Sequence, residues 1–178
     1  MGRGRDAGRK RAGLLSLVVL AWLVAFVPAT AAPAPLTAEG WGDLKIGMRE
    51  REAARRFGFA IPPDDGVNSF ECRVTALTAQ PSLIVMTERG RVTRISIVKS
   101  GGVKTDRGFT VGSREADIRR AYGRGLRIDP HVYEEAPAHY LTFWTVPGRR
   151  GIRYETDRNR RVTVVHAGKS INYVEGCL

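Results

Sequence analysis

Apolar side chains recur along the chain with two different periods. Within residues 46–58 and again within residues 111–123, small apolar side chains recur at helical spacing, with acidic residues near the start and arginines near the end. Stretches with the apolar pattern of β-strands follow each of these segments. The pattern therefore predicts two short helices, each followed by an antiparallel meander.

Eight stretches show the strand pattern, and residues that favour turns separate many of them. Three stretches follow the first helix, at residues 70–77, 82–87 and 92–98, and five follow the second, at residues 126–128, 140–146, 152–156, 162–165 and 171–174. Apolar and polar side chains alternate in the third stretch. The hairpin that contains it is therefore expected to have one face in water.

The two helical segments are also similar to each other in sequence, at a constant offset of 65 residues. Five pairs of positions are identical, namely Gly47/Gly112, Arg49/Arg114, Glu50/Glu115, Arg55/Arg120 and Gly58/Gly123. Matched glycines at both ends favour an internal repeat over a chance similarity of two arginine-rich helices. Apolar faces this small cannot stabilise isolated helices. The predicted fold class is α+β, with two tandem helix-plus-antiparallel-meander repeats forming one domain and the helices packed on the sheet.

The ends of the two helices carry their own signals. Gly58 and Gly123 suit the left-handed conformation that ends a helix. The hydroxyl of Ser113 is expected to cap the second helix, whereas Met48 at the equivalent position of the first helix cannot form a cap. The first helix is therefore expected to be weaker by about 1 kcal/mol.

Residues 1–31 have the pattern of a secretory signal peptide. Five basic residues precede an uncharged run of 16 residues, and small residues lie at positions 29 and 31, which a signal peptidase reads. A membrane-spanning anchor needs about 20 apolar residues, which is more than this run offers. We predict cleavage after Ala31 and an exported protein, periplasmic or extracellular, with no stable membrane anchor.

The expected organisation of the chain follows from the signal peptide and the repeats. After the signal peptide at residues 1–31, a mature N-terminal segment spans residues 32–43. The first repeat is expected at residues 44–99 and the second at residues 109–178, joined by a linker at residues 100–108.

The charge of the chain limits its partners. Five basic residues and one acidic residue lie in the signal peptide, so about +7 of the formal net charge of +11 remains on the mature chain. A basic surface favours an acidic protein or an anionic envelope component as partner, although it also serves simply to keep an exported protein soluble. We do not expect an exported protein to bind nucleic acid.

The chain has two cysteines, Cys72 and Cys177. An oxidising compartment joins an even number of thiols by default, so the sequence predicts one disulfide that closes a loop of about 105 residues. A catalytic thiol is the less favoured alternative, because Cys177 lies where a chain frays unless it is held.

Residues that carry chemistry are sparse. Residues 168–170 lack the upstream glycine of a phosphate-binding loop, and His131, His139 and His166 lack the spacing of a metal pair. We therefore predict no catalytic residue, no metal site and no cofactor. Alternation in the stretch at 140–146 places Tyr140 and Trp144 on one face, with Arg153 on the neighbouring hairpin. These three are candidate binding residues, and a core role for the aromatic side chains is the alternative.

A known family shares this pattern. In each copy a hydrophobic residue and glycine, Ile46-Gly47 or Val111-Gly112, lie five residues before Glu52 or Asp117, and the helix ends in Phe-Gly or Tyr-Gly. Over residues 44–174 the chain resembles the tandem-repeat fold of the beta-lactamase inhibitor protein and the related SmpA/OmlA (BamE-like) envelope domains. The resemblance implies an inhibitory role or a role in envelope assembly. Unlike most SmpA/OmlA members, this chain has no lipidation cysteine.

Two functions remain open at this point. The first is an exported, non-catalytic binding module that recognises a protein or an anionic envelope component. The second is a small secreted hydrolase that uses His131 or His166 with a carboxylate. The lack of a recognisable nucleophile or metal motif favours the first.

Overall fold

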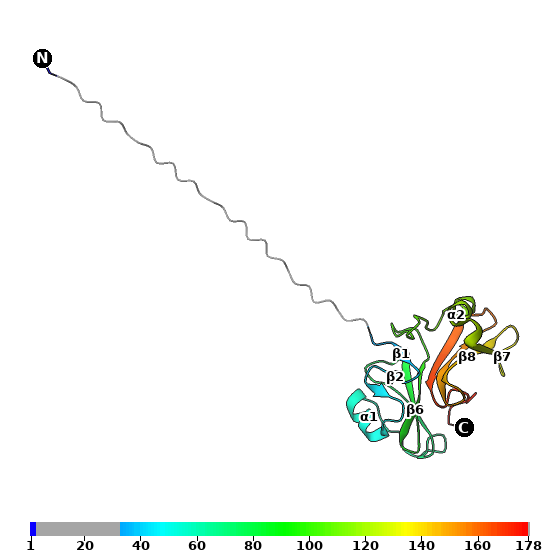
Figure 1. The fold of residues 1–178 in the computed structure, drawn as a ribbon. Coiled ribbons are helices and arrows are strands. Elements are labelled where there is room, and N and C mark those ends of the chain that lie inside the picture. The colour runs from blue at the N-terminus through cyan, green and yellow to red at the C-terminus, as the bar shows by residue number, and fades with distance from the viewer. Residues whose placement is uncertain (3–32, 178) are drawn as a thin grey trace. The chain divides into compact units, whose positions relative to one another are not determined.

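The computed structural model describes residues 1–2 and 33–177. The expected signal peptide, apart from its first two residues, lies outside this description, as does its cleavage site. Within residues 33–177 the fold is α+β, with two helices and a large antiparallel sheet (Figure 1). The helices are α1 (Glu50–Phe57) and α2 (Glu115–Tyr122), and α2 continues into a single 3-10 turn, η1 (Gly123–Gly125).

Seven strands form the large sheet, in the order β4-β5-β6-β10-β9-β8-β7. Their bounds are β4 (Arg73–Ala76), β5 (Leu83–Glu88), β6 (Arg91–Ile97), β7 (Leu126–Pro130), β8 (His139–Val146), β9 (Arg150–Thr156) and β10 (Val162–Gly168). Every neighbouring pair is antiparallel. The central pair is β6 and β10, in which Ser96 lies opposite His166.

A small sheet precedes α1, and the sequence pattern does not predict it. It consists of β1 (Leu36–Thr37), β2 (Gly40–Trp41) and β3 (Leu44–Lys45), each only two residues long. Strands this short show no period that a sequence pattern can reveal. Leu36 and Leu44 are nevertheless fully buried, so this sheet contributes to the core of the domain.

Two local predictions are wrong. Residues 171–174 form no strand, and the carbonyl oxygens of Ser170 and Tyr173 instead accept hydrogen bonds from the side chain of Arg94 in β6. The Ser113 hydroxyl does not cap α2, since it accepts a hydrogen bond from the Thr110 amide at 2.9 Å. The first amide of the helix, that of Glu115, donates instead to the carbonyl oxygen of Arg160 at 3.0 Å. Backbone pairing thus replaces the expected side-chain cap.

The helices cover an apolar face of the large sheet. Buried side chains of this face come from β5, β6, β8, β9 and β10, and they pack with Ala53 of α1 and with Ile118 and Tyr122 of α2. The Tyr154 hydroxyl lies in this core, 2.8 Å from the hydroxyl of Tyr122 and 3.2 Å from that of Thr105, so it is not left without a partner. No helix within the described residues is long and apolar enough to cross a bilayer.

Each helix begins with a buried glutamate. The Glu50 carboxylate accepts hydrogen bonds from Thr87 at 2.6 Å and from Arg73 at 3.3 Å. The Glu115 carboxylate accepts them from Arg119, Thr156 and His139. A buried carboxylate is costly unless it is paired, and both of these are paired with a strand of the sheet. The hydrogen bonds of these two carboxylates therefore connect the start of each helix to the sheet.

Candidate functional site

The face of the sheet opposite the helices is polar, and we refer to it as the polar face. Because side chains alternate along a strand, Ile95 and Ile97 point toward the helices while Ser96 points the other way. The register places Ser96 opposite His166, His166 opposite Arg153, and Arg153 opposite Thr142. Four adjacent strands thus contribute one row of polar side chains.

A histidine and a carboxylate lie at the centre of the polar face. The Ser96 hydroxyl lies 2.7 Å from His166 Nδ1, and His166 Nε2 lies 3.0 Å from Glu155 Oε1. A carboxylate only accepts, so His166 Nε2 carries the proton and Nδ1 accepts from Ser96. The other Glu155 oxygen lies 3.6 Å from His131 Nε2. Both histidines of the hydrolase hypothesis therefore meet the same carboxylate.

Burial decides the charge state of this cluster. It lowers the pKa of His166, more than the hydrogen bond to Glu155 raises it, so the imidazole is neutral at pH 7. Burial alone would raise the pKa of Glu155, but the hydrogen bond from His166 and the neighbouring cations outweigh it and leave this pKa below its ordinary value. The cluster thus holds one stable carboxylate and a neutral imidazole.

Two of the candidate binding residues lie together on the polar face. The Arg153 guanidinium lies 4.8 Å from the centroid of the Tyr140 ring and donates to Thr142 at 3.1 Å. The ring of His131 stacks on Tyr140 at a centroid distance of 4.4 Å. Tyr140 is 4% exposed and Arg153 is 8% exposed, so for Tyr140 the alternative of a core role agrees with its burial.

Trp144, the third candidate, lies farther along β8. It is half-buried, opposite Gly151 of β9. A Cβ at Gly151 would meet the Phe143 carbonyl oxygen at 2.3 Å, so only glycine allows the two strands to approach here. Trp144 is thus neither a core residue nor a fully exposed anchor.

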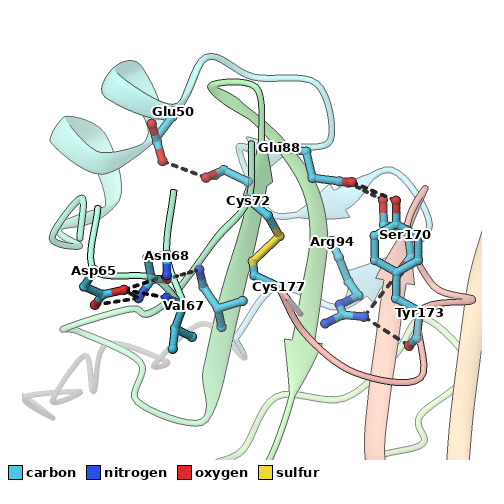
Figure 2. The surroundings of a disulfide bond; sticks show 12 residues. Glu50, Asp65, Val67, Asn68, Cys72, Glu88, Arg94, Ser170, Tyr173 and Cys177 are labelled. Carbon is cyan, nitrogen blue, oxygen red and sulfur yellow. Dashed lines mark hydrogen bonds between the residues drawn. A yellow bond between two sulfur atoms is a disulfide. The ribbon is translucent and has the colours of Figure 1, made fainter. Parts of the chain in front are cut away.

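The C-terminal segment, residues 169–177, covers part of the polar face. Arg94 donates to the carbonyl oxygens of Ser170 and Tyr173 at 3.2 and 3.4 Å, and Arg153 donates to Asn172 at 2.6 Å. The Tyr173 hydroxyl donates to Glu88 at 2.9 Å (Figure 2). Side chains of the sheet therefore hold the segment through hydrogen bonds, which take the role that backbone pairing has between strands.

The predicted disulfide is confirmed and fixes the end of this segment. Cys72 and Cys177 are bonded, with their Cα atoms 5.3 Å apart and a sequence separation of 105 residues (Figure 2). Cys72 directly precedes β4, at the edge of the sheet. The disulfide therefore joins the C-terminal segment to the edge that lies farthest from β7.

A groove of about 930 Å³ opens beside the C-terminal segment. Its walls come from the segment, from the β5–β6 turn, from the region before β4 and from Tyr133. Tyr133 and Tyr173 are well exposed, and each donates its hydroxyl to a glutamate, Glu175 and Glu88 respectively. Arg89 pairs with Glu71 at 2.7 Å along the same groove. The groove thus combines aromatic side chains with charges of both signs on walls tied by the disulfide.

The sequence pattern missed Ser96, Arg94 and Glu155 as parts of one cluster. Each of these polar side chains alternates with apolar ones in its strand, which indicates a shared polar face. The sequence does not show which strands are neighbours, so the cluster itself could not be predicted. The predicted water-exposed face is instead largely covered. The described residues contain no group of three His, Cys, Asp or Glu side chains placed to hold a metal ion.

Comparisons with protein-family models, characterised proteins and solved structures find no match to this chain. The function is therefore argued from the chemistry of its own side chains.

Proposed function

We propose that this protein is an exported, non-catalytic binding module that recognises a protein or an anionic envelope component. The groove beside the C-terminal segment carries the proposal. It has a volume of about 930 Å³, it exposes Tyr133 and Tyr173, and the Cys72–Cys177 disulfide limits the movement of its walls. Exposed tyrosines on a preorganised surface suit recognition, because little entropy is lost on binding.

Export is supported by two independent features. The N-terminal pattern is that of a signal peptide, and disulfides of this kind form and persist in oxidising compartments. The basic mature chain adds a general attraction toward anionic partners.

The two-repeat arrangement belongs to the same proposal. Gly47 donates its amide to the Val92 carbonyl at 2.7 Å, and Gly112 donates to Val162 at 2.8 Å. Residues Arg49 and Arg91 form an isolated antiparallel bridge, as do Arg114 and Arg161. These matched contacts support a duplication of the helix and the last strand of each meander, as in the family that the sequence resembles.

Site-specific photo-crosslinking tests the proposal. A photoreactive phenylalanine analogue is placed at Tyr173 or Tyr133, and for a matched control at Ala121, which is exposed on α2. The two groove positions should yield a discrete adduct with envelope material, and Ala121 should not. Equal capture at all three positions would show that the groove is not the binding surface.

A second candidate function rests on the Ser96–His166–Glu155 contacts. Their order of donors and acceptors is that of a serine hydrolase, in which a carboxylate orients a histidine that accepts the serine proton. Against it, Ser96 is 3% exposed in the middle of a central strand, so a substrate cannot approach its hydroxyl in this conformation. Labelling of the parent by a fluorophosphonate, lost in Ser96→Ala, would favour the hydrolase over the binding module.

A further inference from the structure

Two hollows lined by arginines lie where the helices begin, and the one at α2 shares no lining residue with the groove. The α2 cleft, of about 260 Å³, is lined by Arg114, Arg119, Arg160 and Arg161. The α1 cleft, of about 450 Å³, is lined by five arginines from the corresponding region of α1. Such concentrations of one charge are unfavourable unless a carboxylate or a ligand balances them.

The backbone forces the arginines of the α2 cleft together. Arg114 and Arg161 lie opposite each other in an antiparallel bridge, and the Val162 amide donates to the Ser113 carbonyl at 2.9 Å. The Glu115 amide donates to the Arg160 carbonyl, so the helix terminus itself has no free amide at that position. The Glu115 amide is therefore not available to a ligand, and the arginine side chains place positive charge around the cleft.

One of these arginines has an unfavourable backbone conformation. Arg160 has φ of 54°, in the left-handed region that few residues other than glycine adopt. The corresponding position before β6 is Gly90, with φ of 70°. Arg160 thus occupies a position where glycine would be easier to accommodate, and Arg89 in the α1 cleft, with φ of 48°, shares this conformation.

The α2 cleft has more positive charge than its carboxylate can balance. Glu115 is 1% exposed, and it pairs with Arg119 and His139. Within the described residues, no carboxylate oxygen lies within 4.0 Å of the guanidinium groups of Arg114, Arg160 or Arg161. Three exposed cations therefore remain around a small hollow.

The α1 cleft allows the charge balance of the α2 cleft to be compared within the same molecule. Two of its arginines, Arg73 and Arg89, pair with Asp64 and Glu71, which are exposed carboxylates. Among the described residues, its other three arginines have no carboxylate partner, as many as in the α2 cleft. Its larger volume also spreads the remaining charge. The potential should therefore be more positive in the α2 cleft.

We propose that the α2 cleft binds a phosphate group, at a site separate from the groove. Guanidinium groups pair with oxyanions through parallel N–H donors, and a phosphate offers enough anionic oxygens for several arginines at once. A carboxylate would leave most of the donors without a partner. The phosphate can be free or carried by a lipid headgroup, and the two sources share this chemistry.

Calorimetric titration with inorganic phosphate, at low ionic strength in chloride buffer, tests the site in the mature protein. Arg160→Gly and Arg114→Gln should each weaken phosphate binding at least about fivefold. Arg160→Gly should not unfold at lower urea concentration than the parent, because glycine accepts this φ, so a loss of binding there is not a loss of fold. The matched control Arg49→Gln removes the same charge from the α1 cleft and should change the affinity less than twofold.

Three results would overturn the proposal. They are no phosphate binding by the parent, unchanged affinity in both α2-cleft variants, or an equal loss in Arg49→Gln, which would indicate net charge alone. Sedimentation with phosphatidylglycerol vesicles separates the two sources. Sedimentation weakened by the same two variants assigns a lipid headgroup, and phosphate binding without sedimentation assigns a soluble phosphate. Crosslinking at Tyr173 is independent of all these results, so a failure here leaves the proposed function standing.

Discussion

The two faces of the large sheet are covered in different ways. On one face the helices contribute apolar side chains, and Ile95 and Tyr154 are fully buried among them. On the other face the cover is a segment without regular structure, held by hydrogen bonds to Arg94 and Arg153 and by a disulfide. Burial of apolar surface stabilises the cover of the first face, whereas the cover of the polar face is stabilised by correctly placed hydrogen bonds and the disulfide. The difference implies that, once the disulfide is removed, the C-terminal segment can leave the polar face while the domain stays folded.

Loss of the disulfide should have the largest effect. The double variant Cys72→Ala, Cys177→Ala should lower the free energy of unfolding by about 4 kcal/mol, because its closed loop is long. Urea denaturation of the parent, with and without reductant, gives the matched control. Amide hydrogen exchange should rise in residues 169–177 and much less in α1 and α2. An equal rise on both faces would contradict the comparison.

Neighbouring residues on opposite faces provide a sharper test. Ile95→Ala should cost about 3 kcal/mol, because it leaves a cavity under the helices. Ser96→Ala, one residue later on the polar face, should cost about 1 kcal/mol, because it removes only the donor to His166 Nδ1. Chemical denaturation measures both, and similar costs would mean that the two faces do not differ as described.

Trp144→Ala tests how much the half-buried tryptophan near the end of β8 contributes to the stability of the domain. A fully buried tryptophan costs ~3–5 kcal/mol on truncation, and a half-buried one should cost roughly 2 kcal/mol. The thermal midpoint should therefore fall by several degrees without loss of cooperativity. A change below measurement would place Trp144 among exposed residues that are available to a partner.

The smallest expected effect is on pH dependence. Burial holds the pKa of His166 below its ordinary value of 6.5, so the unfolded chain binds a proton at this residue before the folded one does. Stability should therefore fall as the pH drops below about 6.5, by at most ~1.4 kcal/mol per pH unit from this residue. His166→Gln should remove that contribution. If the free energy of unfolding changed equally in parent and variant between pH 7.5 and 5.5, this would be evidence against a neutral, buried imidazole.

Local patterns predicted much of this fold. Both helices were expected where they occur, Gly58 ends α1 with φ of 66°, and seven of the eight expected strand regions contain a strand. The exception, at residues 171–174, is held by Arg94 of β6, a partner that is remote in sequence. The pattern of apolar and polar residues within the segment cannot indicate such a contact.

The candidate site was less accessible from sequence. A count of two cysteines was sufficient for the disulfide, and alternation was sufficient to place Tyr140 and Trp144 on one face. The sequence left the burial of Tyr140 open and did not predict that of Arg153, because burial depends on what covers the sheet. His131 covers Tyr140 from the loop of the β7–β8 hairpin, and the C-terminal segment contacts Arg153 from beyond β10.

The pairing of β6 with β10 also constrains how the chain folds. Val165 lies opposite Ile97, about 70 residues earlier, so the centre of the sheet closes only after most of the chain is available. Until then β6 is an edge strand with an open row of amides and carbonyls, which is a route to aggregation. High contact order of this kind slows folding to the millisecond-to-second range. The first meander therefore keeps an unpaired edge until the last strand of the sheet is available.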